Sequence, residues 1–333
     1  MNIHQQIQAE IQAASHIVIT AHKSADGDSI GSSLGLLYFI EKLGKQAVIC
    51  HPDKAPDFLY WLDTSAIILM EENPEEVAAQ MKKADLIFCL DYNATKRVGS
   101  EMQVLLEEST CKKIMIDHHL EPEDFPTLAI SDTTASSTSQ LIVDVIEHSG
   151  HLDLLDAKIG TPLYVGILTD TGGFKFNSVK PRTHEVLAKI IAAGVEHHLI
   201  HEKLNDTNTE SRLRLQGFAL SEKLEILYDY NVALIPLSKE ELAKYNYKKG
   251  DTDSLANLVL SIKGMKAAIM LKEDGGIIKM SFRSKGAENP VNILAKEHFN
   301  GGGHANAAGG MSNLTVNETV EKLKGLIPQY FSK

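Results

Sequence analysis

Four short runs of apolar, mostly β-branched residues constrain the fold of this chain more than any other feature of its sequence. They are HIVITAH (16–22), QAVICH (46–51), DLIFCLD (85–91) and KKIMIDHH (112–119). Each run is continuously apolar, as expected of parallel strands that are buried on both faces. Between them, residues 28–43 and 74–83 have helical spacing. Alternating strands and helices predict an α/β fold with an open, mostly parallel sheet and helices on both faces.

The rest of the chain predicts further helices and then a second, smaller α/β domain. Helices are expected at 136–149, 153–168, 181–194 and 209–225, followed by strands at 226–237, 266–272 and 277–283 and helices at 252–263 and 315–327. At roughly 150 residues per domain, 333 residues suggest two domains. The polar stretch NDTNTESR (205–212) is typical of a hinge. We predict a first domain over 1–204, a hinge and linker helix over 205–225, and a second domain over 226–333 across a cleft from the first.

Composition excludes several classes of protein. With 43% hydrophobic and 23% charged residues, the chain is typical of a folded globular protein. No run approaches the ~18 apolar residues of a membrane span, and the first twenty residues lack the features of a signal peptide. Cys50, Cys89 and Cys111 are odd in number, far apart and without a C-x-x-C pair. These features predict buried thiols and a cytoplasmic location, with no membrane partner.

The charge is divided unevenly along the chain. The net charge of -11 consists of -15 over residues 1–210 (16 Lys and Arg against 31 Asp and Glu) and +4 over residues 211–333 (17 against 13). An acidic part suits a cation site and a basic part suits an anionic ligand, although uneven surface charge for solubility is the alternative interpretation. The small positive balance argues against long duplex DNA as a partner and is sufficient for a small phosphorylated ligand.

Carboxylates and histidines follow three of the four predicted strands. They are His22, Asp26 and Asp28 after the first, Asp91 after the third, and Asp117, His118 and His119 after the fourth, with Asp170 at the end of a later helix. Ligands of open parallel sheets bind at the carboxyl ends of the strands, where these groups would converge. Each Asp alone could be a helix cap or a turn residue. Together they would repel one another without cations, and their mixed oxygen and imidazole donors favour Mn²⁺ or a similar ion.

These residues resemble a known family. HKSADGD, DYN, DHH and TDTGG, in this order and spacing, resemble the four motifs of the DHH phosphoesterases, and SFRS with GGGHANAAGG resembles the DHH-associated C-terminal domain. The whole chain is most similar to the NrnA-type branch of bifunctional oligoribonucleases and 3′,5′-bisphosphoadenosine phosphatases. Ser24-Ala25 departs from the family's Asn/Ser-Pro pair before Asp26, which predicts a change in loop stiffness but no lost ligand.

The resemblance implies a two-metal hydrolase with two Mn²⁺ ions. One ion would be held by His22, Asp26 and Asp91, and the other by Asp28, Asp91, His118 and Asp170, so that Asp91 bridges them. His119 would act on the phosphate or the leaving oxygen as a hydrogen-bond donor, and Asp117 would orient a histidine.

The resemblance also assigns substrate binding to the second domain. The run Gly301–His304 fits neither G-x-G-x-x-G nor a Walker motif, and composition alone would allow a flexible turn. Arg283 alone could form a surface salt bridge. By resemblance, however, Arg283, Gly302, Gly303 and His304 are expected to bind a phosphate group.

The predicted activity is hydrolysis of short 5′-phosphorylated single-stranded oligonucleotides, about two to five nucleotides long, and of 3′,5′-bisphosphoadenosine to AMP. The alternatives are a pApA or cyclic-dinucleotide phosphodiesterase, an exopolyphosphatase or pyrophosphatase, and an inactive metal-dependent nucleotide-binding module. A homodimer is common in the family. Two further features stay outside the predicted site: the HHxxH pattern of His197, His198 and His201, and the aromatic residues Phe58, Tyr60 and Trp61, which could stack on a base or pack in a core or dimer face.

Overall fold

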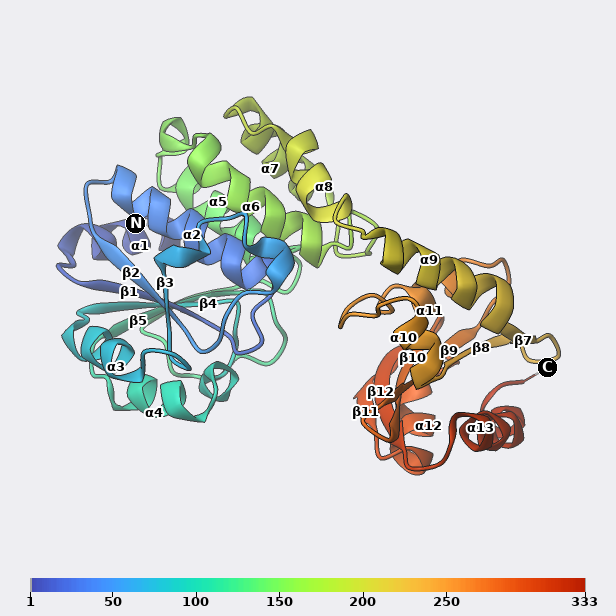
Figure 1. The fold of residues 1–333 in the computed structure, drawn as a ribbon. Helices are drawn as coiled ribbons and strands as arrows, with labels where there is room; N and C mark the ends of the chain where they lie inside the picture. Colours follow the sequence, from blue (N-terminus) through green and yellow to red (C-terminus); the bar gives the residue numbers. More distant parts are fainter. Residues whose placement is uncertain (1, 333) are drawn as a thin grey trace. The chain divides into compact units, whose positions relative to one another are not determined.

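The computed structural model describes residues 2–332, and the chain divides into two compact units (Figure 1). The first is Met1–Thr207 and the second is Asn208–Lys333. The boundary lies inside the polar stretch 205–212. Helix α9 (Glu210–Phe218) follows it directly, belongs to the second unit, and continues as a π-helical turn, η5 (Ala219–Lys223). Each unit has hydrophobic clusters of its own.

The first unit contains the predicted parallel sheet. Its strands are β1 (Ile17–Ala21), β2 (Ala47–His51), β3 (Ile67–Leu69), β4 (Leu86–Leu90), β5 (Lys112–Asp117) and β6 (Leu128–Ser131). They lie in the order β3-β2-β1-β4-β5-β6, and every neighbouring pair is parallel. The four predicted strands are confirmed. The edge strands β3 and β6 escape sequence analysis because they are short and half exposed, and so lack a continuous apolar run.

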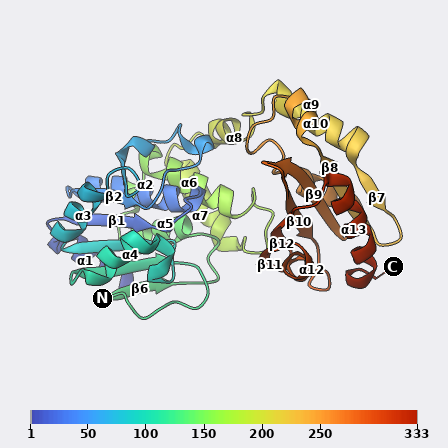
Figure 2. The same cartoon turned by 60° about the horizontal axis from the view of Figure 1, so that its bottom comes forward.

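Helices cover both faces of this sheet (Figures 1 and 2). They are α1 (Ile3–Ala13), α2 (Gly27–Lys42), α3 (Pro74–Lys83), α4 (Ser100–Glu108), α5 (Thr138–His148), α6 (Ala157–Asp170), α7 (Pro181–Ala192) and α8 (His197–Asn205), with short 3₁₀ turns at Asp57–Leu59 (η1), Thr64–Ala66, Thr95–Val98 and Leu152–Leu154. The predicted fold class is confirmed. Helices α1 and α4 were not expected from the sequence, and each buries two side chains.

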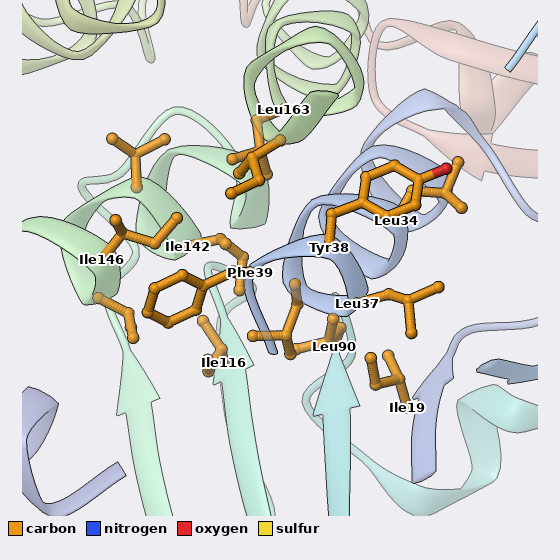
Figure 3. Close-up of a cluster of buried hydrophobic side chains, with 14 of the residues drawn as sticks. Ile19, Leu34, Leu37, Tyr38, Phe39, Leu90, Ile116, Ile142, Ile146 and Leu163 are labelled. Carbon is orange, nitrogen blue, oxygen red and sulfur yellow. The ribbon is translucent and has the colours of Figure 1, made fainter. Parts of the chain in front are cut away.

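Two apolar layers explain why the strands are apolar on both sides. Ile19, Leu90 and Ile116 pack against Phe39 of α2 and Leu163 of α6 in the larger layer (Figure 3). Strand residues on the opposite face pack against α3 and α4 in the smaller layer, which includes Val18, Ile87, Met115, Val77, Met81, Met102 and Leu106. With both faces covered, every position of the central strands β1 and β4 is buried.

Helices α2 and α6 approach one another unusually closely because of glycine. Gly27, Gly31 and Gly35 recur every fourth residue, so they share one face of α2. A Cβ atom at Gly31 would lie 2.4 Å from the carbonyl oxygen of Pro162 in α6. The glycines in GDSIGSSLG therefore serve helix packing, and this close approach brings the start of α2 to the end of α6.

The second unit is built on a mixed sheet in the order β11-β12-β10-β9-β8-β7. Its strands are β7 (Glu225–Leu227), β8 (Val232–Leu237), β9 (Ala267–Asp274), β10 (Ile277–Ser284), β11 (Gly302–His304) and β12 (Ala307–Ser312). In addition to α9, its helices are α10 (Lys239–Lys244), α11 (Leu255–Leu260), α12 (Val291–His298) and α13 (Val316–Tyr330). The predicted second α/β unit is confirmed, but Gly302–His304 forms a strand at the sheet edge and not a turn.

One face of the second sheet is covered only in part. Helices α12 and α13 pack on the face that carries Ile278, Met280 and Phe282. On the other face, α9, α10 and α11 pack over β8 and β9. Side chains of β10 that point to this second face are exposed or half exposed, as are Gly302 and His304 of β11. No helix within residues 2–332 is both long enough and apolar enough to pass through a membrane.

Candidate metal centre

Three adjacent strands bring the predicted ligands to one edge of the first sheet. Strands β1, β4 and β5 are neighbours in the order β1-β4-β5. His22 directly follows β1, Asp91 directly follows β4, and β5 ends at Asp117 with His118 and His119 next in the chain. Asp91 adopts a positive φ of 62°, uncommon for a residue with a side chain, which turns the chain sharply at the strand end.

His22, Asp26 and Asp91 form the first group of potential metal ligands, with ligand atoms all within 4.8 Å of one another. Nε2 of His22 lies 3.6 Å from Oδ2 of Asp26 and 3.3 Å from Oδ2 of Asp91. Nδ1 of His22 lies 2.9 Å from the carbonyl oxygen of Lys23 and can donate to it. This hydrogen bond leaves Nε2 available as a ligand atom, an arrangement common among metal-binding histidines.

Asp28, His118 and Asp170 form the second group. Nε2 of His118 lies 3.9 Å from Oδ2 of Asp28, 3.4 Å from Oδ2 of Asp170 and 3.6 Å from Oδ1 of Asp91. Asp91 thus directs Oδ2 to the first group and Oδ1 to the second. A third group, Asp91, His118 and His119, overlaps the second. The close pairing of α2 and α6 accounts for the meeting of Asp28 and Asp170.

Asp26 combines two roles that sequence analysis treated as alternatives. Its Oδ1 accepts hydrogen bonds from the backbone N–H groups of Asp28 and Ser29 and so caps α2. Its Oδ2 faces His22. One carboxylate therefore begins the helix and points a free oxygen into the ligand cluster.

Burial and neighbouring charges shift the pKa values of several groups in this cluster. Burial, followed by the Asp91 and Asp170 carboxylates, raises the pKa of Asp28 well above its usual range. Burial opposes protonation of His22, but Asp26 and Asp91 outweigh it and raise the pKa of this histidine to about 10. Burial also opposes ionisation of Asp91, but His118 and His22 hold its pKa below the usual range. Four carboxylates this close together need positive charge, which protons or metal ions can supply.

Two residues that support the cluster were missed by sequence analysis. The backbone N–H groups of Thr138 and Ser139 donate to the two carboxylate oxygens of Asp28, at 2.6 and 2.8 Å. The hydroxyl of Thr138 donates to Oδ1 of Asp91 at 3.1 Å. The N-terminus of α5 therefore positions two of the proposed ligands. The only sequence signal was SSTSQ (136–140) at the start of a predicted helix, which is equally typical of a simple cap.

His119 and Asp117 form a separate pair beside the cluster. Nδ1 of His119 lies 2.7 Å from Oδ1 of Asp117, and the backbone N–H of His119 donates to Oδ2 at 3.0 Å. Asp117 is fully buried, and the His119 side chain is 32% exposed. With Nδ1 engaged by Asp117, the Nε2 of His119 is available for a ligand.

Arg283 and His304 lie in one row of the second sheet. Arg283 of β10 pairs with Ala307 of β12, and Ala307 pairs with His304 of β11. Directly paired residues of antiparallel strands point to the same face, so both side chains share the uncovered face. Gly303 has φ +140°, and a Cβ there would lie 2.5 Å from the carbonyl oxygen of Ala307, whereas a Cβ at Gly302 would meet nothing within 4 Å. Packing therefore explains glycine at 303 but not at 302.

The HHxxH histidines form no group of three ligands in residues 2–332. His201 instead lies 3.1 Å from the hydroxyl of Tyr164.

The donor set fits two divalent cations. It combines carboxylates with imidazole nitrogens and contains no thiolate. Asp91 lies between the two groups and faces His22 with one oxygen and His118 with the other. His22, Asp26 and Asp91 would hold one ion, and Asp28, Asp91, His118 and Asp170 the other. Such mixed oxygen and nitrogen donors suit Mn²⁺ and related ions.

Comparisons with known proteins show matches in both units of the chain. Residues 16–167 match the DHH family, N-terminal domain, and residues 230–333 match the DHHA1 domain. The chain is 30% identical to the bifunctional oligoribonuclease and PAP phosphatase NrnA of Thermus thermophilus, over 92% of this chain and 87% of that protein. It is 28% identical to the cyclic-di-AMP phosphodiesterase GdpP of Bacillus subtilis, over 96% of this chain but 49% of that longer protein.

A solved structure extends the comparison to the fold. The crystal structure of an exopolyphosphatase-related protein from Bacteroides fragilis superposes with a TM-score of 0.89 at 40% identity, covering 98% of this chain and 96% of that one. The DHH and DHHA1 matches fall in the first and second units, respectively. The predicted resemblance is confirmed, and the chain belongs to the DHH family of phosphoesterases.

Proposed function

We propose that this protein uses two divalent cations, Mn²⁺ by preference, to hydrolyse short 5′-phosphorylated oligonucleotides to nucleoside monophosphates and 3′,5′-bisphosphoadenosine to AMP. The observation that carries the proposal is the convergence of six Asp and His side chains, in which one oxygen of Asp91 faces His22 of the first group and the other faces His118 of the second. The similarity to NrnA supports this choice of substrates. The three unpaired cysteines are consistent with a cytoplasmic enzyme.

The residues in and around the cluster would have different roles in phosphate hydrolysis. Two bound cations would neutralise phosphate charge and make water a better nucleophile. His22, Asp26, Asp28, Asp91, His118 and Asp170 would hold them, while α5 keeps Asp28 and Asp91 in position. His119, oriented by Asp117, would donate a hydrogen bond or a proton from Nε2 to the phosphate or the leaving oxygen.

The second unit would bind the remainder of the substrate. Arg283 and His304 project from the same uncovered face, beside the exposed glycine Gly302. Guanidinium and imidazole donors next to an exposed backbone suit a phosphate group. The net charge of +4 over residues 211–333 is consistent with this role.

A second candidate is hydrolysis of pApA or a cyclic dinucleotide. Its support is the similarity to GdpP, which extends over 96% of this chain. Both candidates use the same chemistry and differ only in the nucleotide that is bound. Polyphosphate and pyrophosphate fit less well, because such substrates need several cationic side chains near the metals and the first 210 residues carry a net charge of -15.

One experiment compares these substrates directly. The purified protein is incubated with Mn²⁺ and separately with pGpG, pApA, cyclic di-AMP, 3′,5′-bisphosphoadenosine, pyrophosphate and a 24-nucleotide RNA, and the products are separated by chromatography. We expect rapid release of monophosphates from the dinucleotides and from the bisphosphate, and no turnover after EDTA treatment. Dominant release of phosphate from pyrophosphate, or full activity in EDTA, would contradict the proposal.

A further inference from the structure

A cavity of about 450 Å³ lies beside the metal centre, entirely within the first unit. Thr169, Gly172 and Gly173 line it, and they flank Asp170 in the chain. Asp170 in turn lies 3.4 Å from His118. A ligand with a phosphate at the metal centre could therefore place its next chemical group in this cavity.

The cavity has an apolar wall with an exposed aromatic ring. Phe58, Leu168 and Leu204 form this wall. Phe58 is 43% exposed, although the next residue, Leu59, is fully buried and fixes the short 3₁₀ turn η1 in the core. Turn η1 also contacts α8, which carries Leu204. The ring is thus held at the cavity on an anchored turn, while one face remains available to a ligand.

Polar side chains also line the cavity. Lys175 and His201 both border the cavity. His201 is held by Tyr164 at 3.1 Å. The side chain of Lys175 is exposed and makes no ion pair or hydrogen bond with residues 2–332. An aromatic ring, aliphatic side chains and an available ammonium group suit a flat heterocycle attached to a sugar phosphate.

We propose that this cavity binds the nucleoside of the nucleotide whose phosphate occupies the metal centre, with the base stacked on Phe58. This inference rests on the proposed function and adds a binding site for the base to it. Stacking on an aromatic ring tolerates every base, and the cavity wall at Phe58 is apolar. The site should therefore accept purines and pyrimidines, and its contribution should disappear when the substrate has no base.

Direct binding tests the inference without hydrolysis. The probe is 2-aminopurine riboside 5′-monophosphate, whose fluorescence changes on stacking, titrated in the presence of Mg²⁺. We expect Phe58→Ala to raise its Kd about tenfold or more, and Phe58→Tyr to retain binding close to that of the unmodified protein. Tyr60→Ala is the matched control, because Tyr60 is 49% exposed on the same loop but does not line the cavity. An unchanged Kd in Phe58→Ala would overturn the inference.

Hydrolysis separates this inference from the proposed function. Phe58→Ala should raise KM about tenfold for pApA but leave KM unchanged for an analogue with abasic sugars. If the protein hydrolyses pApA and both substrates respond equally to Phe58→Ala, the base site is wrong and the proposed function stands. If the protein binds the 2-aminopurine nucleotide through Phe58 but hydrolyses no dinucleotide, the base site stands and the proposed function is wrong.

Discussion

At the scale of single residues, Asp91 is the side chain on which both halves of the metal centre depend. Its two oxygens face His22 and His118, and it is 2% exposed. Asp91→Ala removes one proposed ligand from each ion, so we expect loss of activity and of bound metal, measured by metal analysis after gel filtration. Thr95→Ser is a mild change in the 3₁₀ turn that follows β4, and this control should retain both activity and bound metal. Two metals bound at normal affinity in Asp91→Ala would exclude a bridging role.

His119 should behave differently from the metal ligands. Its Nδ1 is engaged by Asp117, and Nε2 is proposed to act on the substrate. We expect His119→Ala to bind both metals but to lower kcat by about 10²–10⁴-fold. Asp117→Asn should lower kcat by a smaller factor. Because Asp117 would act through His119, adding Asp117→Asn to His119→Ala should lower kcat little further. Full additivity of the two effects in kcat would contradict this dependence.

His51 provides a test of pH dependence. It is fully buried against Ser33, and burial, with a smaller effect of His22, lowers its pKa to about 3. The unfolded chain, with a histidine pKa near ~6.5, therefore binds a proton first as the pH falls. The contribution of neutral His51 to the free energy of unfolding is complete above pH ~6.5 and decreases toward pH ~3 by up to ~1.4 kcal/mol per unit.

The measurement is urea unfolding of metal-free protein between pH 7.5 and 5. His51→Gln should show a weaker pH dependence of the free energy of unfolding than the unmodified chain. Equal slopes in the two proteins would show that His51 is not buried in its neutral form.

At the scale of elements, the α2–α6 contact determines whether Asp28 and Asp170 meet. Gly31→Ala would place Cβ 2.4 Å from a backbone carbonyl that cannot rotate away. We expect a loss of about 1–3 kcal/mol in the free energy of unfolding of the first unit and weaker metal binding. In Gly217→Ala, the added Cβ would meet nothing within 4 Å in helix α9. This control should be neutral or more stable by about 0.5–1 kcal/mol. Calorimetry measures the stability of both variants. Equal changes in Gly31→Ala and Gly217→Ala would refute the packing argument.

At the scale of the whole molecule, we propose that the second unit binds the part of the substrate that lies beyond the metal centre. Arg283→Ala and His304→Ala should raise KM for dinucleotides by about 10- to 100-fold, as expected for loss of a charge-assisted hydrogen bond. Hydrolysis of bis-p-nitrophenyl phosphate, which has no second phosphate, should change little. Lys279→Ala is the control, because Lys279 shares this face of β10 but pairs with Asp274. Equal losses on both substrates would place Arg283 and His304 in the catalytic centre or in the folding of the second unit.

Sequence alone determined the parallel sheet, the helices α2 and α3, and the identity of the clustered Asp and His residues. Strands buried on both faces are continuously apolar, and the ends of adjacent parallel strands meet at one edge, so local pattern was sufficient. Edge strands β3 and β6 carry no such pattern. The run Gly301–His304 could be a flexible turn by composition alone, because three consecutive glycines have low strand propensity. Only pairing with β12 makes Gly302–His304 a strand.

Only the tertiary structure decided how the site is supported. Thr138 and Ser139 lie more than 100 residues from Asp28, and their hydrogen bonds to it exist only after α5 packs beside α2. By sequence alone, the glycines of α2 could belong to a loop or to a helix interface. The carbonyl of Pro162 opposite Gly31 shows that they form a helix interface. Phe58 and Leu204 border one cavity because α8 packs against turn η1. Such relations join distant segments through three-dimensional packing, which leaves no periodic or local signal along the chain.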